Sequence, residues 1–218
     1  MDYVQTIESE ITAVHDKLFR ENSFWIAARD GKLTMNHIRG MLKESYHRST
    51  PIVQNIPMLI LKAPDYETKI KAARNLADEL PHPRMHFEMA KYVNLTPEEI
   101  INHNPIIETK ALAAWRVTIF YLGSFTENRT ASWLTEGFNQ KYSTLMMKSL
   151  KENFGLDEEK QGLFPVHAVA DKDHVDEAKD DIRKWVKTEE EMNKCVKVAR
   201  DGGEFMELNY SAQFTKYS

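Results

Sequence analysis

The sequence predicts an all-α protein, and two observations support that prediction. The 218 residues include only 8 glycines and 8 prolines, well below the roughly 12% of average usage. A β-sandwich needs a turn about every ten residues, so this chain is too poor in turn residues for one. Apolar residues also recur at steps of three and four, the spacing of one helix face. With 42% hydrophobic residues the chain can fill a sizeable core. We expect one helical domain over residues 1–218, with seven to eight helices.

The first half of the chain contains three strongly periodic segments. A helix is expected over residues 4–20, and a short element follows it. Thr34 stands where a helix N-cap is needed, so the next helix begins there. That helix runs toward Pro51 and Pro57, each of which should bend or end it. A further helix is expected over residues 65–80 because its apolar residues share one face.

Turn and capping signals divide the second half. Residues 96–99 read Thr-Pro-Glu-Glu, a capping box with proline at the first helical position. Long helices are expected over 107–125, 128–154, 163–183 and 186–200. Gly155 should end the second of these, and the pair Gly202-Gly203 should end the last. The aromatic residues beyond that pair, in the segment 203–218, would then pack on a partner subunit or fold back.

Charge and cysteine content exclude several function classes. Lys and Arg number 29 against 33 Asp and Glu, for a net charge of -4, so there is no electrostatic reason to expect a nucleic-acid partner. The single cysteine, Cys195, cannot form an internal disulfide and suits a reducing compartment. The N-terminus is acidic and lacks a secretion signal, and no apolar run approaches the roughly 20 residues that cross a bilayer. We expect a cytoplasmic protein with no membrane partner.

Metal-ligand residue types gather in three groups on three predicted helices. The groups are Glu79 with His86, Glu136 alone, and His167 with Asp171 and His174. In a continuous helix a separation of seven is about 700°, close to two full turns, so Glu79 and His86 share a face. Spacings of four and three likewise place the third group on one stripe. Ligands from three helices are what a metal site in a bundle core requires.

The charge of these groups favours two metal ions over one. Three carboxylates in a low-dielectric core would carry a charge of -3, which is costly without compensation. Two divalent ions bring +4, and three neutral imidazoles complete a nitrogen and oxygen set suited to iron or manganese. The surplus positive charge would accept an anionic substrate group.

This pattern resembles a known family. Glu-x6-His, a lone Glu about fifty residues further on, and His-x3-Asp-x2-His are similar to the motifs of the haem-oxygenase-like diiron oxidases and oxygenases. The likeness extends over roughly residues 10–185, and it includes Phe24-Trp25, the segment 31–34 and the segment 95–99. The resemblance implies a seven-helix haem-oxygenase-like fold. By that resemblance, two iron ions are held by Glu79, His86, Glu136, His167, Asp171 and His174.

The resemblance also implies a chemistry. Members of the family activate O2 to a peroxo-diiron(III) species and cleave C–H, C–C or C–N bonds of small molecules, here with an external reductant. The branch that consumes its own side chains is disfavoured, because Trp25 and Met146 stand where it has tyrosine and lysine. A small carboxylate-bearing substrate is expected, an amino acid such as a tryptophan derivative converted to a nitrile, or alternatively a fatty acid that is decarboxylated. Candidate pocket walls are Trp25, Tyr46, Phe120 and Trp133, each of which could instead be core.

Other readings remain open from the sequence. A haem oxygenase of the same fold would use His15 as the proximal ligand. A ferritin-like site needs two Glu-x-x-His elements, and the chain has one, Glu44 to His47. Thiaminase-like relatives use a cysteine nucleophile, for which Cys195 is the one candidate. A helical scaffold without enzymatic activity would bind no stoichiometric metal. A homodimer is common in this fold by family resemblance.

Two prolines interrupt the first ligand pair. Pro81 and Pro83 lie between Glu79 and His86, and each would cost about 3 kcal/mol inside a regular helix. The sequence therefore predicts a distorted segment over residues 79–86, held in shape partly by metal ligation.

Overall fold

The computed structural model describes residues 2–218, except for the side chains of residues 169–171, so the side chain of the predicted ligand Asp171 lies outside the described part. No described residue lies in a strand, which confirms the all-α prediction. The α-helices are α1 (Tyr3–Glu21), α2 (Ser23–Arg29), α3 (Met35–Asn55), α4 (Pro57–Lys62), α5 (Tyr66–Glu79), α6 (His82–Ala90), α7 (Pro97–Ile101), α8 (Ile107–Leu122), α9 (Phe125–Phe154), α10 (Leu163–Trp185) and α11 (Glu189–Lys216).

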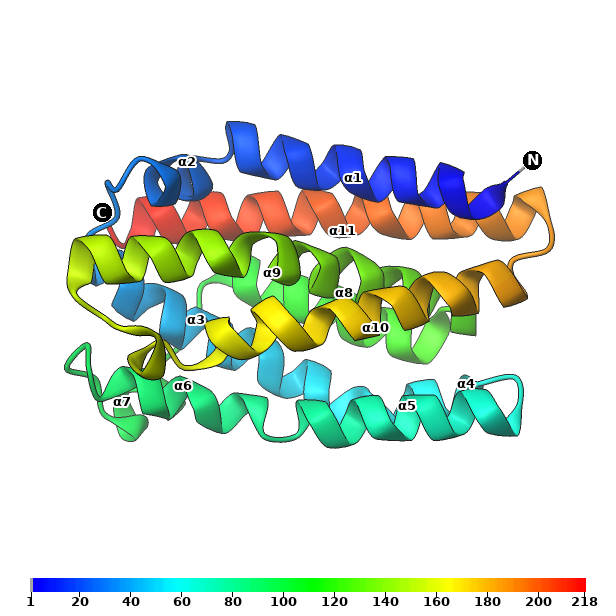
Figure 1. Cartoon of the computed structure of the whole chain (residues 1–218), viewed down its shortest axis with the longest axis horizontal. Coiled ribbons are helices and arrows are strands. Elements are labelled where there is room, and N and C mark those ends of the chain that lie inside the picture. Colours follow the sequence, from blue (N-terminus) through cyan, green and yellow to red (C-terminus); the bar gives the residue numbers. More distant parts are fainter. Residues whose placement is uncertain (1) are drawn as a thin grey trace.

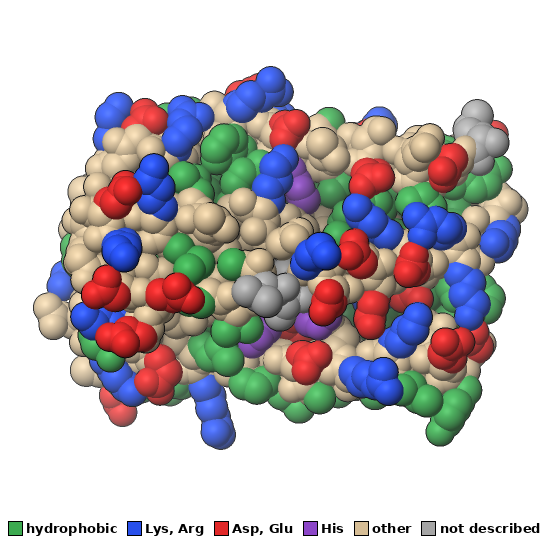
Figure 2. Space-filling view, in the orientation of Figure 1, with side chains coloured by type: hydrophobic (Ala, Val, Ile, Leu, Met, Phe, Trp, Pro, Cys, Tyr) green, Lys and Arg blue, Asp and Glu red, His purple; other side chains and the backbone are tan. Residues whose placement is uncertain are grey.

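The long helices lie lengthwise side by side (Figure 1). Helix α9 packs most extensively against α10, and α1 packs against α11. Helices α5 and α6 form the opposite edge of the bundle, where α6 contacts α3 and α10. The face in Figure 2 carries intermixed acidic and basic side chains without a large field of one sign. None of the helices in the described residues is long and apolar enough to cross a membrane.

The helical segments of residues 2–218 exceed the seven to eight expected because short helices flank the long ones and a separate helix, α4, follows α3. Pro51 is accommodated inside α3, whereas Pro57 begins α4 as its first residue. Helix α8 ends at Leu122, and Ser124 caps α9 with its side chain on the backbone N–H of Glu127. The other local signals are confirmed: Thr34 and Thr96 each cap a helix, and Gly155 ends α9 with a left-handed φ of 66°.

The expected stop at Gly202-Gly203 is wrong. Helix α11 continues through both glycines to Lys216. A Cβ built at Gly202 would lie 2.5 Å from both Leu134 and Trp115, and one at Gly203 would lie 2.5 Å from Val14. The glycines therefore allow α11 to approach α9, α8 and α1 closely, and this close packing outweighs their low helix propensity.

The segment 203–218 packs on its own chain as the end of α11. Tyr210 belongs to the main core, and Phe214 packs against that core. The hydroxyl of Tyr217 donates a hydrogen bond of 2.6 Å to Oε1 of Glu44, a carboxylate with no exposed surface. The aromatic residues of this segment thus fold back, one of the two alternatives that the sequence left open.

The buried apolar side chains form two clusters. The main cluster joins α1, α2, α9 and α11 around large side chains such as Phe24, Leu134 and Phe138. A smaller cluster joins α4, α5, α8 and the start of α9 around Leu59 and Phe120. Residues of both clusters line one internal cavity, which therefore lies between them.

His15 connects α1 to α9 within the main core. It is 5% exposed, and its Nε2–H donates to the carbonyl oxygen of Leu134 at 2.8 Å, while its ring lies edge-on to Phe138. Burial lowers the pKa of His15 to about 4, although the hydrogen bond to Leu134 partly opposes this shift. Because the folded pKa lies below the ordinary value of about 6.5, the neutral ring is favoured in the native state.

Replacing Gly202 with Ala should lower the free energy of unfolding by about 1–3 kcal/mol, because the new methyl group would overlap two buried side chains. Urea denaturation measures this loss. The matched control is Glu204→Ala on the exposed side of α11, which should change the free energy by less than about 0.5 kcal/mol. A Gly202→Ala variant as stable as the wild type would contradict the close packing of α11.

The stability contributed by neutral His15 should be complete above its unfolded pKa of about 6.5 and should be lost as the pH falls toward 4. His15→Gln keeps an N–H donor but does not titrate. Between pH 7.5 and pH 5 its free energy of unfolding should therefore fall by about 2 kcal/mol less than that of the wild type. Urea titrations at both pH values test this, with Asp16→Asn as the control that retains the wild-type pH dependence. Parallel curves for His15→Gln and wild type would refute the role.

Candidate metal centre

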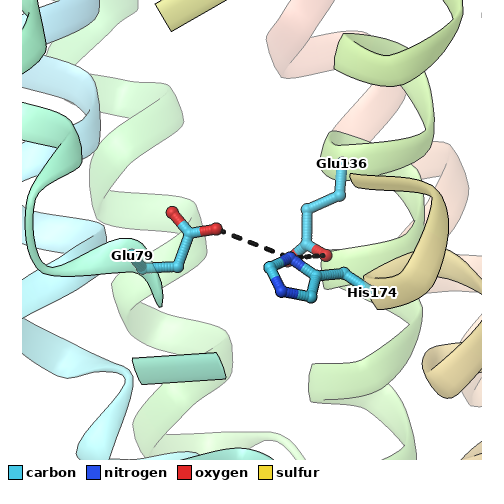
Figure 3. A group of neighbouring side chains, drawn as sticks. All are labelled: Glu79, Glu136 and His174. Carbon is cyan, nitrogen blue, oxygen red and sulfur yellow. Dashed lines mark ion pairs between the residues drawn. The ribbon is translucent and has the colours of Figure 1, made fainter. Parts of the chain in front are cut away.

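Glu79, Glu136 and His174 meet between three helices. Glu79 is the last residue of α5, Glu136 lies midway along α9, and His174 lies in α10. The Nδ1 atom of His174 is 3.7 Å from Oε1 of Glu79 and 3.7 Å from Oε2 of Glu136. Figure 3 shows the three side chains pointing toward one another. One ligand atom from each lies within 4.8 Å of the other two, so the residues of three separate sequence groups converge.

The geometry of this group fits a divalent metal better than a closed ion pair. Charge-assisted hydrogen bonds close to about 2.7–2.9 Å, whereas two ligand atoms about 2.0–2.2 Å from a shared ion lie roughly 3–4 Å apart. Oε1 of Glu79 and Nδ1 of His174 are buried and make no hydrogen bond with any described residue. Two buried polar atoms facing each other at ligand spacing are what an ion between them would satisfy.

His82 adds an imidazole to the group around Glu79, and the sequence analysis did not predict it. Its Nδ1 lies 2.6 Å from Oε2 of Glu79, and its ring centroid lies 5.0 Å from that of His167. Glu79 thus directs one oxygen toward His174 and the other toward His82. The spacing could have shown this, because residues three apart are neighbours on a helix and the backbone of Leu80 and Pro81 keeps helical angles.

His86 is not part of this group. The predicted break between Glu79 and His86 is confirmed, because α5 ends at Glu79 and α6 begins at His82. The seven-residue argument assumed a continuous helix and fails for that reason. The Nδ1–H of His86 donates to the carbonyl oxygen of His82 at 3.2 Å, and its Nε2 accepts from Ser45 at 3.0 Å. Burial lowers the pKa of His86 to about 3, and its role as a ligand stays a prediction.

The three predicted ligands on α10 lie in different positions relative to the cluster of Glu79, Glu136 and His174. His174 joins the cluster and is 7% exposed, and its Nε2 lies 3.5 Å from the carboxylate of Asp78. His167 lies beside His82 and lines the cavity. Asp171 lies between them in the helix, with its side chain outside the described residues.

Glu79 is held in its ionised form. Burial raises its pKa, but the hydrogen bond with His82 and the nearby rings of His167 and His174 outweigh that effect and place the pKa below its usual value. An ionised carboxylate in a largely buried position is a ready metal ligand.

Two adjoining cavities open beside this cluster. The first, about 120 Å³, is lined by Glu79, Glu136, His82 and His167 at the cluster and by apolar residues of α3, α4 and α8 elsewhere. The second, about 80 Å³, shares six lining residues with the first, including His167. A small molecule in the first cavity would lie next to the acidic and imidazole groups, and one in the second cavity would lie next to His86 and His167.

Of the four aromatic residues predicted to line a pocket, two line one of the two cavities and two do not. Phe120 lines the first cavity and Trp25 the second. Tyr46 lines neither of the two and packs against the rings of His86 and Phe87. Trp133 is 4% exposed and also lines neither of them, with Nζ of Lys179 5.0 Å above its ring. For Tyr46 and Trp133 the core reading, which was also open from the sequence, fits the structure.

The alternative sites of the sequence analysis receive no support from the geometry. His15 donates its Nε2 proton to Leu134 and lines neither cavity, so it is not placed as a proximal haem ligand. Cys195 is fully buried, and burial raises the pKa of its thiol, which opposes a nucleophilic role. His47 donates to the carbonyl of Ile100 rather than sharing a site with Glu44.

Solved structures share this fold across the whole chain. A domain of unknown function with a haem oxygenase-like fold from Shewanella denitrificans OS217 superposes with a TM-score of 0.88 at 18% identity, covering 98% of this chain and 92% of its own. A TenA homologue from Pseudomonas syringae pv. tomato DC3000 superposes with a TM-score of 0.85 at 16% identity, covering 98% of this chain and 93% of its own. A CADD-like protein of unknown function from Nostoc punctiforme PCC 73102 superposes with a TM-score of 0.74 at 12% identity, covering 98% of this chain and 99% of its own. At these identities the likeness establishes the fold alone.

The sequence itself carries the family assignment. No curated protein matches the chain significantly. A family model described as iron-containing redox enzyme matches residues 39–205. That stretch contains Glu79, Glu136 and His174, so the matched region is also the region that builds the cluster. The chain therefore belongs to the family of iron-containing redox enzymes and has the haem oxygenase-like fold.

Proposed function

We propose that this protein is a non-haem diiron enzyme that uses O2 to oxidise a small carboxylate-bearing substrate, an amino acid in the first instance. The observation that supports this most directly is the convergence of Glu79, Glu136 and His174 next to a cavity. Membership of an iron-containing redox family makes iron the metal to test first. A mixed set of carboxylates and imidazoles suits iron in either oxidation state.

The donor atoms divide into two groups around Glu79. Oε1 of Glu79 would hold one ion with Glu136 and His174. Oε2 of Glu79 accepts a hydrogen bond from Nδ1 of His82, so Nε2 of His82 and the neighbouring His167 would hold the second ion. Asp171 and His86 remain further ligands proposed from the sequence resemblance. Bound iron would supply the oxidising power through its reaction with O2.

The protein's own residues position and shield the reaction. Asp78 lies on the far side of the His174 ring and orients it, as carboxylates commonly do for ligating histidines. The hydrogen bond from His82 fixes the Glu79 carboxylate. Apolar side chains such as Leu112 and Phe120 cover the cavity and limit access of water to the substrate.

The substrate class follows from charge and wall chemistry. Two divalent ions would exceed the negative charge of Glu79 and Glu136 even with Asp171 added, and the excess attracts an anionic group. The cavity walls combine aliphatic and aromatic side chains with about as many polar and charged ones, which suits a molecule that has both an apolar body and a charged end. An amino acid with an apolar side chain fits this description, and a fatty acid is the alternative that a substrate panel separates.

Anaerobic loading with Fe(II) should give about two irons per chain. His174→Ala and Glu136→Gln should lower the iron content and abolish oxidation of amino acids when O2 is added, because each removes a ligand from the cluster. Metal analysis measures the iron content, and mass spectrometry detects the oxidation products of amino acids and, in parallel reactions, of fatty acids. Asp173→Asn, an exposed neighbour of His174, is the matched control and should keep both properties.

Three results would contradict this proposal. Chains without stoichiometric iron would favour a helical scaffold. One haem per chain, seen by its intense near-ultraviolet band, would favour a haem enzyme. Full iron content and turnover in His174→Ala would remove this histidine from the centre.

Fe(II) should also slow amide hydrogen exchange in residues 79–86. These residues join the end of α5 to the start of α6, and ligation of Glu79 and His82 would link the two helices across the break. We expect exchange at least about tenfold slower with iron, while amides of α1 keep their rates. Equal rates over 79–86 with and without iron would show that metal does not stabilise the junction.

A further inference from the structure

Arg116 is a buried cation whose described hydrogen-bond partners are all neutral. It lies on α8, is 3% exposed, and its guanidinium lies 3.8 Å above the ring of Phe120. Its Nη1 donates to Asn128 at 3.2 Å and its Nη2 donates to Ser132 at 3.1 Å. A buried charge is costly unless an opposite charge compensates it, so the absence of a carboxylate among these partners needs an explanation.

A second buried arginine shows what compensation looks like in this protein. Arg129 on α9 is also 3% exposed, and its Nε lies 2.8 Å from the carboxylate of Asp181. Among the described side chains, the arginines that form such ion pairs are Arg29, Arg129, Arg183 and Arg200. At equal burial, Arg116 has no such ion pair among the described residues.

Arg48 also lacks an ion pair with a described carboxylate, and it lines the first cavity together with Arg116. It lies on α3, half-buried, with its guanidinium 5.8 Å from the ring centre of Tyr210. Its hydrogen bonds are long, 3.3 Å to Ser45 and 3.5 Å to Asn209, and both acceptors are neutral. Arg48 and Arg116 both line the first cavity. Two guanidinium groups without a paired carboxylate therefore border one enclosed space.

The charge balance of this space depends on whether metal is bound. Burial lowers the pKa of Arg116 to about 9, and Glu136 opposes that shift, so the guanidinium keeps its charge at neutral pH. Glu79 and Glu136 are carboxylates that line the cavity with the two arginines. Cations ligated by these carboxylates would take up their negative charge, and the arginines would then need another anion.

We propose that Arg116 and Arg48 bind the carboxylate group of the substrate in the first cavity, and that metal occupancy of the neighbouring centre strengthens this binding. Guanidinium groups match carboxylates in geometry and bind them with charge-assisted hydrogen bonds. The apolar body of the ligand lies on the wall formed by Ile52, Leu59 and Leu112. This inference rests on the proposed function for the metal centre and adds the residues that select the substrate.

Binding of three probes of equal chain length tests the inference: hexanoate, L-norleucine and the neutral hexanamide. Titration calorimetry on anaerobic Fe(II)-loaded protein should show at least one carboxylate binding tenfold or more tighter than hexanamide. Arg48→Gln and Arg116→Gln should each remove most of that preference. Arg74→Gln, an exposed arginine on α5, is the matched control and should retain it. The preference for norleucine or hexanoate separates amino acids from fatty acids as the source of the carboxylate.

The inference is overturned if hexanamide binds as tightly as both carboxylates, or if both glutamine variants keep wild-type preference. If circular dichroism shows that Arg116→Gln does not fold, Arg116→Lys and Arg48→Gln decide instead, since lysine retains the charge without the planar donor pair. Iron content is measured on the same samples. Two irons without a carboxylate preference would overturn this inference and leave the diiron function standing. Arginine-dependent carboxylate binding by protein that takes up no iron would support the arginine site but overturn both its dependence on metal and the diiron function.

Discussion

Compensation of buried charge is the constraint on which this structure depends. Between its two apolar clusters the bundle holds Glu79, Glu136 and Arg116 beside a small cavity, instead of filling the space with hydrocarbon. Elsewhere the protein pairs its buried charges directly, as Arg129 does with Asp181 and Glu44 does with His103. Around the cavity, opposite charges share a space without closing on one another. That arrangement costs stability, and the proposed binding of cations on one side and of an anion on the other depends on it.

The break between α5 and α6 determines which donors reach the centre. A regular helix would carry the chain past Glu79 without interruption, whereas Pro81 stops it and lets His82 begin a new helix. The result is a carboxylate with a separate histidine for each oxygen, His82 and His174. Because α6 also contacts α3 and α10, the junction connects the residues proposed to bind metal to the walls of both cavities.

Local signals in the sequence predicted local structure well. Thr34 and Thr96 cap helices and Gly155 ends one, because capping depends on residues within one turn. The pair Gly202-Gly203 carried the same kind of signal and was misread as a stop. There the decisive contacts come from Val14, Leu134 and Trp115, which are remote in sequence, so no local rule could reveal them.

The sequence by itself determined the helical class, the ligand types and the family resemblance, since periodicity, composition and motif spacing are properties of the linear chain. It also indicated that two prolines disturb the segment 79–86. The tertiary structure decided that Glu136 and His174 meet Glu79 from separate helices, and that Arg48 and Arg116 share a cavity with the acidic residues. Both outcomes depend on how separate helices pack. The distance between side chains on different helices is set by crossing geometry and close packing of the core, which spacing along one helix does not encode.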